Sequence, residues 1–189
     1  MCQYIHCTRH LALVYDRERD HRFYATSDAS FNVEDGRGVT GFSFHAAGGA
    51  VAWKSSTQKL ATLSSCEAEL LAVDQCTREL RFLAQLTRDI GIRIDLPVPV
   101  AQDNIATIQL VTSGHFNART KHVALRYHHC HEQQEDGLLK VSHLSTDLIP
   151  ADALTKALDV QAFTRHRAVL LGHHHLSWDN AQAVDGSAG

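Results

Sequence analysis

The sequence predicts an α/β domain with a mixed, five-stranded sheet flanked by helices. Segments with the two-residue period of strands fill the first third of the chain. Segments with the 3.6-residue period of helices follow them and alternate with shorter strands. With 189 residues and a hydrophobic fraction of 44%, the chain is long and apolar enough for one buried core. We therefore expect one domain with tails.

Three strands are expected before the first long helix. The segment "HRFYATSDAS" alternates loosely and carries aromatic residues, which predicts a strand that ends near Asp28. The runs "GVTGFSFHAA" and "GAVAWKS" predict a hairpin, with the glycines of "AAGG" in its turn. From Ser64 to about Arg88 the period becomes helical, and Ser64 or Ser65 is suited to cap the start of that helix.

Shorter elements follow the long helix. "IDLPVPVAQD" predicts a strand ending at Asp103, and "NIATIQLVTSG" a short helix stopped by Gly114. "RTKHVALRYHHCHEQQEDG" predicts a helix ending at Gly137, and "LLKVSHLS" a strand. The last region begins with a turn, and Pro150 fits a first helical turn, so helices are expected up to Gly172.

Acidic residues stand where these elements end or begin. Asp28 and Asp103 end strands, and Asp152 opens the last helical region. Such positions in an α/β sheet can converge on one crevice, where carboxylates hold two divalent ions about 4 Å apart and cleave phosphodiesters. Oxygen ligands suit Mg²⁺ or Mn²⁺. The alternative for any one of these aspartates is that it is simply a surface residue among the 21 acids.

Two glutamates near the start of the long helix are alternative candidates for this site. Glu67 and Glu69 point to nearly opposite sides, because each helical residue turns by about 100°. The face of Glu69 continues as an apolar stripe through Ala72, Val73, Cys76, Leu80 and Leu83. The face of Glu67 is expected to meet solvent and continues through Leu71, Asp74, Arg78 and Arg81. A carboxylate on a buried face needs compensation, so Glu69 is predicted in the site and Glu67 as a first-turn acid.

Composition narrows the class of protein. The sequence has no apolar run long enough to span a membrane and no secretory signal. Its five cysteines are odd in number and form no CxxC pair, which predicts reduced thiols in an intracellular protein. A formal charge of −3 argues against a protein that simply coats DNA, because such proteins are usually basic. It does not exclude a metal-dependent nuclease, because buried acids that bind cations would lower the formal charge.

The chain resembles the ribonuclease H domain of Ty1/copia-type retrotransposon polyproteins. The similar segments occur in the family's order from about residue 2 to 171: "LALVYDRERD", "YATSDAS", "GFSFHAAGGAVAWKSSTQKLATLSSCEAELLAV", "QDNIATIQL", "ARTKHVALRYHH" and "LSTDLIPADALTKAL". The resemblance implies a ribonuclease H-like fold and cleavage of the RNA strand of RNA/DNA hybrids with two Mg²⁺ ions, or Mn²⁺. It implies that the catalytic, metal-binding acids are Asp28, Glu69, Asp103 and Asp152.

The resemblance also carries expectations about context. Residues 1–15 are expected to end a linker from a reverse transcriptase domain absent from this chain, residues 16–175 to form the ribonuclease H-like domain, and residues 176–189 a flexible tail. The expected location is intracellular, in the cytoplasm or a virus-like particle. Two departures stand out: Ala124 replaces an acid common in the family, and "STDLIP" lacks the histidine that assists product release in cellular ribonucleases H. The second departure predicts slower turnover.

Residues beside the acids are candidates for binding nucleic acid. Polar side chains flank the acids at Gln58, Ser64, Ser65 and Asn104, with helix capping as the alternative for the serines. A local basic patch suited to phosphates comprises Arg119, Lys121 and His122, with a solvated helix entry as the alternative. Lys54 is a weaker candidate. A zinc site at His128 with His131 or Glu132 is a minor possibility, because no second pair of ligands follows at suitable spacing.

Three functions remain open from the sequence. The first is the hybrid-specific endonuclease with two metal ions. The second is a catalytically decayed module that keeps the fold and binds nucleic acid. The third is a nuclease of the same fold that acts on DNA, against which the copia-type segments outside the acids argue.

Overall fold

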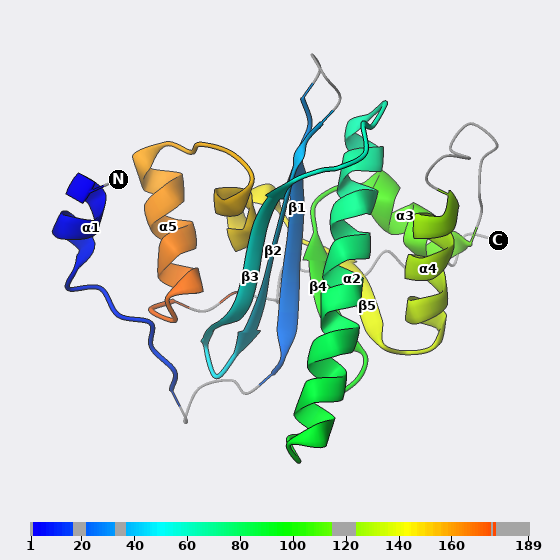
Figure 1. Ribbon diagram of the computed structural model, residues 1–189, viewed down its shortest axis with the longest axis horizontal. Helices are drawn as coiled ribbons and strands as arrows, with labels where there is room; N and C mark the ends of the chain where they lie inside the picture. The colour runs from blue at the N-terminus through cyan, green and yellow to red at the C-terminus, as the bar shows by residue number, and fades with distance from the viewer. Residues whose placement is uncertain (1, 17–21, 33–36, 115–123, 175, 177–189) are drawn as a thin grey trace.

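The computed structural model describes residues 2–16, 22–32, 37–114, 124–174 and 176. Its centre is a five-stranded sheet in the order β3-β2-β1-β4-β5 (Figure 1). The strands are β1 (Tyr24–Ser30), β2 (Val39–Ala46), β3 (Gly49–Thr57), β4 (Val98–Gln102) and β5 (Leu139–His143). The β1–β2 and β2–β3 pairs are antiparallel, whereas β1–β4 and β4–β5 are parallel. The predicted mixed sheet of five strands is confirmed.

Helices cover both faces of the sheet. On one side lie α2 (Ser65–Asp89), α3 (Ile105–Ser113) and α4 (Ala124–Glu135), and on the other lie α1 (Cys2–Thr8) and α5 (Val160–Leu170) (Figure 1). Two short 3₁₀ helices, η2 (Thr146–Leu148) and η3 (Pro150–Leu154), connect β5 to α5. Each face has its own apolar core. One contains Phe42, Phe44, Leu70 and Leu80, and the other contains Tyr24, Leu144 and Ile149.

The predicted hairpin and short helix are present, but of the two glycines expected in the hairpin turn only Gly48 lies there, since Gly49 begins β3. Ala47 and Gly48 join β2 to β3, both with positive φ (49° and 85°), as a two-residue hairpin turn requires. Asn104 caps α3, and Gly114 ends that helix in the left-handed conformation (φ 68°).

The long helix α2 begins with a side-chain cap. Ser64 accepts a hydrogen bond from the backbone N–H of Glu67 (3.2 Å), and the Glu67 carboxylate accepts one from the N–H of Leu63 (2.7 Å). Glu67 therefore serves the helix start, as predicted. The predicted apolar stripe is buried as well, including Ala72, Val73, Cys76 and Leu80.

One prediction for α2 is wrong. The face of Glu67, expected to meet solvent, is buried at Glu67, Leu71 and Asp74. The reason is tertiary, because α4 packs against this side of α2. The helical period alone does not reveal a second helix that covers the polar face.

The N-terminal segment contains a helix that the sequence did not predict. In α1, the Tyr4 ring packs edge-on against Phe163 of α5, with 6.0 Å between ring centroids. After α1, the N–H of Val14 donates to the Leu171 carbonyl (2.8 Å), and the N–H of Asp16 donates to the Ala47 carbonyl (2.9 Å). The expected linker residues thus lie against the domain. Almost all of the expected tail, residues 177–189, lies outside the described part of the chain.

No helix among the described residues combines the length and the apolar character needed to cross a membrane. Among the cysteine side chains that the structure describes, four are free thiols: Cys7, Cys66, Cys76 and Cys130.

Candidate active site

Three carboxylates converge at one end of the sheet. Asp28 lies on β1, Asp103 directly follows β4, and Glu69 lies near the start of α2. One ligand oxygen of each lies within 4.8 Å of those of the other two. The convergence follows from the register: β1 and β4 are parallel neighbours in which Ala25 pairs with Val100, so Asp28 and Asp103 are level at the carboxyl ends of the strands.

The fourth predicted acid approaches from the other face. Asp152 lies on η3, is 4% exposed, and its charge acts on Asp28. It is not part of the group of three whose oxygens lie within 4.8 Å of one another. Its carboxylate forms an ion pair with Lys156, one helical turn later.

The position of η3 depends on Gly41, which pairs with Asp28 in the β1–β2 ladder. A Cβ atom at Gly41 would lie 2.7 Å from Cγ2 of Thr155 and 2.8 Å from the Ala151 carbonyl oxygen. Only a residue without a side chain lets η3 lie this close to β2. Gly41 thereby keeps Asp152 beside Asp28.

Burial and mutual repulsion disfavour ionisation of these acids. Burial raises the pKa of Glu69 to about 9, and the neighbouring charges of Asp28 and Asp103 add to that shift. Burial also raises the pKa of Asp28 to about 6, although a hydrogen bond from Thr155 opposes the shift. Burial and the repulsion between neighbouring carboxylates thus disfavour the charged forms of Glu69 and Asp28. A divalent ion would supply a compensating positive charge, and an all-oxygen donor set fits Mg²⁺ or Mn²⁺.

Neighbouring side chains hold the acids in place. The Gln102 amide donates to Glu69 (3.1 Å), and the Thr146 hydroxyl donates to Asp103 (2.6 Å). The Thr155 hydroxyl donates to the Asp28 carboxylate. Gln102, Thr146 and Thr155 were not among the residues predicted to belong to the site. The available signals were the position of Thr155 inside the "ADALTKAL" segment and that of Gln102 next to Asp103; Thr146 had none.

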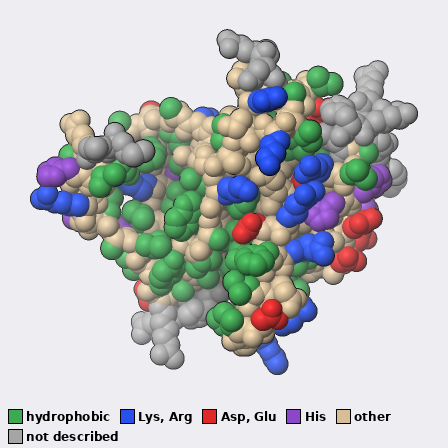
Figure 2. All heavy atoms as spheres, in the orientation of Figure 1, with side chains coloured by type: hydrophobic (Ala, Val, Ile, Leu, Met, Phe, Trp, Pro, Cys, Tyr) green, Lys and Arg blue, Asp and Glu red, His purple; other side chains and the backbone are tan. Residues whose placement is uncertain are grey.

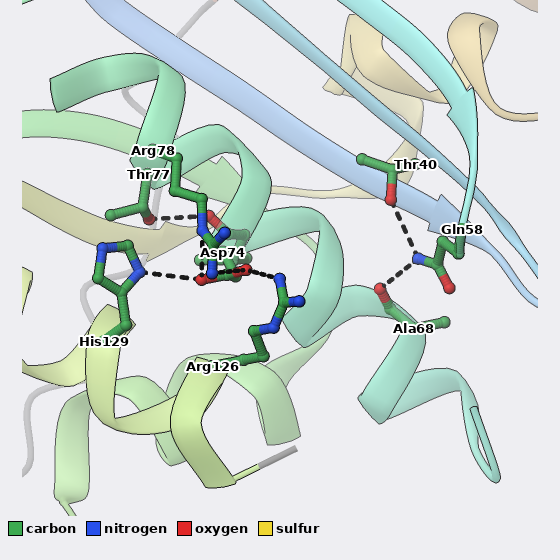
Figure 3. A network of polar contacts seen from close by, with 9 residues as sticks. Thr40, Gln58, Ala68, Asp74, Thr77, Arg78, Arg126 and His129 are labelled. Carbon is green, nitrogen blue, oxygen red and sulfur yellow. Dashed lines mark hydrogen bonds and ion pairs between the residues drawn. The ribbon is translucent and has the colours of Figure 1, made fainter. Parts of the chain in front are cut away.

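The predicted nucleic-acid-binding residues differ in placement. Ser64 and Asn104 cap helices, and Ser65 is exposed at the start of α2. Gln58 is buried and donates to Thr40 and to the Ala68 carbonyl (Figure 3), so contact with a ligand would require its side chain to turn outward. The patch of Arg119, Lys121 and His122 lies outside the described residues.

Basic side chains gather over α2 and its surroundings on the face seen in Figure 2. There, Lys54, Lys59, Arg78 and Arg126 help to line a hollow of about 520 Å³ beside the β3–α2 connection. The weaker candidate Lys54 therefore belongs to a larger basic surface that the sequence did not predict. Its residues come from β3, the β3–α2 connection, α2 and α4, so that Lys54 and Arg126 are distant in sequence.

The histidine-rich part of α4 forms a different cluster from the one considered above. His131 faces the Val111 carbonyl through Nδ1 (2.8 Å). Asp74, His129 and Cys130 come together instead, but Arg126 and Arg78 also bind the Asp74 carboxylate (Figure 3). Two guanidinium groups already neutralise this carboxylate, so the arrangement favours a polar link between α2 and α4 over a zinc site.

Known proteins are similar to this chain in sequence. No family model matches it. It is 34% identical over 140 residues to the retrovirus-related Pol polyprotein from transposon TNT 1-94 of Nicotiana tabacum. It is 32% identical over 140 residues to the corresponding polyprotein from transposon RE1 of Arabidopsis thaliana. Each match covers 74% of this chain but only 10% of the polyprotein.

Solved structures are similar in fold. LC11 ribonuclease H1, isolated from compost, superposes with a TM-score of 0.56 at 15% identity and covers 72% of this chain and 94% of its own. The same enzyme in complex with an RNA/DNA hybrid gives a TM-score of 0.54 at 14% identity, with 71% and 94% covered. The chain is thus a relative of plant retrotransposon Pol polyproteins, over about a tenth of their length, and has the ribonuclease H-like fold.

Proposed function

We propose that this protein is an endonuclease that hydrolyses the RNA strand of RNA/DNA hybrids with two divalent metal ions. The observation that carries the proposal is the convergence of Asp28, Glu69 and Asp103 within 4.8 Å, with Asp152 beside Asp28. Similarity to retrotransposon polyproteins and to a ribonuclease H1 solved with a hybrid supports the choice of substrate.

The four acids have distinct tasks in this proposal. Bound Mg²⁺ or Mn²⁺ would activate a water molecule and stabilise the departing 3′-oxygen. Asp28, Glu69 and Asp103 would hold the ions, and Asp152, which pairs with Lys156, would add a carboxylate from η3. Ionisation of Glu69 accompanies ion binding, since its pKa of about 9 keeps it protonated otherwise.

Substrate contacts are proposed on both sides of the acids. A hybrid displays 2′-hydroxyls in a shallow minor groove, which polar side chains can recognise. Ser65 is exposed beside the site, and Lys54 and Lys59, which line the hollow together with the Asp74-bound Arg78 and Arg126, suit phosphates. Arg119, Lys121 and His122, just before α4, remain predicted phosphate contacts, as do Gln58, Ser64 and Asn104 for the sugar–phosphate backbone.

The wider context is proposed from the relatives. The similarity to polyproteins favours a Ty1/copia-type element, a reverse transcriptase domain as partner, and an intracellular location in cytoplasm or a virus-like particle.

Cleavage of a labelled RNA/DNA hybrid in Mg²⁺ tests the proposal. The experiment compares the protein with Asp103→Asn and with Asp136→Asn, an exposed aspartate after α4 that controls for the charge change. We expect RNA-strand cleavage by the protein and by Asp136→Asn, and none by Asp103→Asn. Duplex RNA and duplex DNA should remain intact, and cleavage of duplex DNA instead would establish the DNA nuclease. Hybrid binding without cleavage by any variant would favour the decayed binding module.

A further inference from the structure

Gln102 occupies a central position behind the three converging acids. It is the last residue of β4, it is fully buried, and Asp103 follows it directly. Its amide oxygen accepts hydrogen bonds from the backbone N–H groups of Asp103 (2.7 Å) and Asn104 (3.1 Å). Its amide nitrogen donates to the Glu69 carboxylate (3.1 Å). One side chain thus joins β4, α2 and the start of α3.

These partners fix the orientation of the amide. Backbone N–H groups can only donate, so the side-chain oxygen must face Asp103 and Asn104. The NH₂ group is then left to face Glu69, where it meets an acceptor. If the amide were flipped, its NH₂ group would face the N–H groups of Asp103 and Asn104, and its oxygen would face the Glu69 carboxylate, so neither side could form a hydrogen bond. Together with a backbone hydrogen bond from Ala29, the Gln102 amide therefore holds Glu69 in one direction, and Gln102 links it to the turn that carries Asp103.

The position of the bonds matters for a metal ion. A carboxylate bound by a fixed donor keeps one oxygen occupied and presents the other in a defined direction. Partners of this kind behind metal ligands typically change metal affinity or activity by about 10-fold to 100-fold when they are removed. A group that merely strengthened the fold would change stability and leave the affinity of the folded protein alone.

We infer that Gln102 is a positioning residue that fixes Glu69 and Asp103 for binding a divalent ion. The inference rests on the proposed function. Gln102 has no role of its own in the chemistry and acts only through the two carboxylates.

Binding of Mn²⁺ to Gln102→Met, measured by calorimetry together with the melting temperature, tests the inference. Gln134→Met is the matched control, because Gln134 also accepts from a backbone N–H, that of Val141, and donates to a side chain, that of Thr112. Gln134 links α4 to β5 and α3, away from the acids. We expect both variants to lose stability, and only Gln102→Met to raise the Mn²⁺ dissociation constant, by about tenfold.

A second measurement does not depend on the variant folding. The unmodified protein is labelled with ¹⁵N at the glutamine side-chain amides and titrated with Mg²⁺. The NH₂ signal of Gln102 should shift, and its titration curve should give the same dissociation constant as Mg²⁺ binding to the whole protein. The NH₂ signal of Gln134 should not shift. A Gln102 signal that ignores Mg²⁺ would overturn the inference. So would a folded Gln102→Met protein with Mn²⁺ affinity within twofold of the original, or an equal loss of affinity in Gln134→Met.

The failure of the proposed function looks different. If the unmodified protein binds neither Mn²⁺ nor Mg²⁺, the metal-dependent function fails and the inference falls with it. If the unmodified protein binds metal and cleaves hybrid but Gln102→Met binds Mn²⁺ equally well, only the inference fails.

Discussion

Protonation of Glu69 makes the stability of the fold depend on pH. Its pKa is about 9 in the folded, metal-free protein, against 4.5 for an ordinary glutamate. Because the folded state binds this proton more tightly, the associated stability is complete below about pH 4.5 and disappears as the pH rises to about 9. Asp28, with a pKa of about 6, loses its smaller contribution earlier, between about pH 4 and 6.

We therefore predict that the metal-free protein loses stability from pH 7 to 9, by at most about 1.4 kcal/mol per pH unit for this one proton. Urea unfolding in EDTA measures the loss. Glu69→Gln should flatten the dependence, because the amide does not titrate, and all other groups are the same in both proteins. Equal pH slopes in the two proteins would contradict a raised pKa at Glu69.

Lys156 brings a positive charge close to the acids. It pairs with Asp152 and lowers the pKa of Asp28 by its charge. At pH 8, where Asp28 is ionised in either case, Lys156→Met removes a charge that would repel a cation at the proposed metal site. We predict that Mn²⁺ then binds about three- to tenfold more tightly, a change of about 1 kcal/mol that fits a half-exposed lysine.

Calorimetry of Lys156→Met beside Lys140→Met checks this prediction. Lys140 is an exposed residue of β5, so its variant carries the same change in net charge without a change near the acids. Weaker Mn²⁺ binding in Lys156→Met would show instead that Lys156 is needed to hold Asp152.

Helix geometry separated the two glutamates, because each residue of a helix turns by a fixed angle; both are buried, but Glu69 is the one that meets Asp28 and Asp103. Asp28 and Asp103 were predictable because they lie near the carboxyl ends of strands. The hydrogen bond from Thr155 to Asp28 was not, since it joins residues 127 positions apart and depends on the path of the whole chain.

Between elements, the contact of α2 with α4 contains a buried charge. The Asp74 side chain is fully buried and binds Arg78, Arg126 and His129 from two helices (Figure 3). Its partners are partly exposed, with 55% for Arg78 and 30% for Arg126. Loss of the carboxylate leaves two cations facing a buried gap, whereas loss of Arg78 leaves Asp74 with two partners.

We accordingly predict that Asp74→Ala destabilises the protein by about 3 kcal/mol or more. Arg78→Ala should cost less than about 1 kcal/mol, as is usual for an exposed partner. Urea unfolding of both variants measures the difference. Similar small losses in the two would mean that the ion pairs do not hold α4 to α2.

A helix, strand or turn could be predicted from the sequence when residues adjacent in the chain determine it. The hairpin turn, the α2 cap and the end of α3 at Gly114 follow from residues adjacent in sequence, and all are present in the structure. The burial of Asp74 and the presence of α1 were not predictable in the same way. Both depend on a surface supplied by another part of the chain, α4 for the first and α5 for the second.

In the molecule as a whole, α1 contributes little apolar burial. Tyr4 is 45% exposed and Ile5 59% exposed. The segment after α1 is better anchored, since the Tyr15 hydroxyl donates to the Ala50 carbonyl (2.8 Å) and Val14 bonds to Leu171. The two parts of the N-terminal segment should therefore differ in their importance for the fold.

We predict that a chain starting at His10 keeps its fold, with a melting temperature lowered by less than about 4 °C and unchanged Mn²⁺ affinity. A chain starting at Arg22 should melt at a clearly lower temperature, because it also loses Val14 and Tyr15. Calorimetric melting of both chains decides this. Failure of the first chain to fold would place α1 within the folding unit.

The close approach of η3 to Gly41 matters when other copies of such a sequence are assessed for an intact site. A copy can retain every acid and still have lost its site, because any side chain at position 41 collides with the backbone of the turn that carries Asp152. The whole turn, and its carboxylate with it, would have to move away from Asp28. A check of the four proposed catalytic acids alone would count such a copy as intact. The geometry of this site thus depends partly on Gly41, a residue that has no functional group.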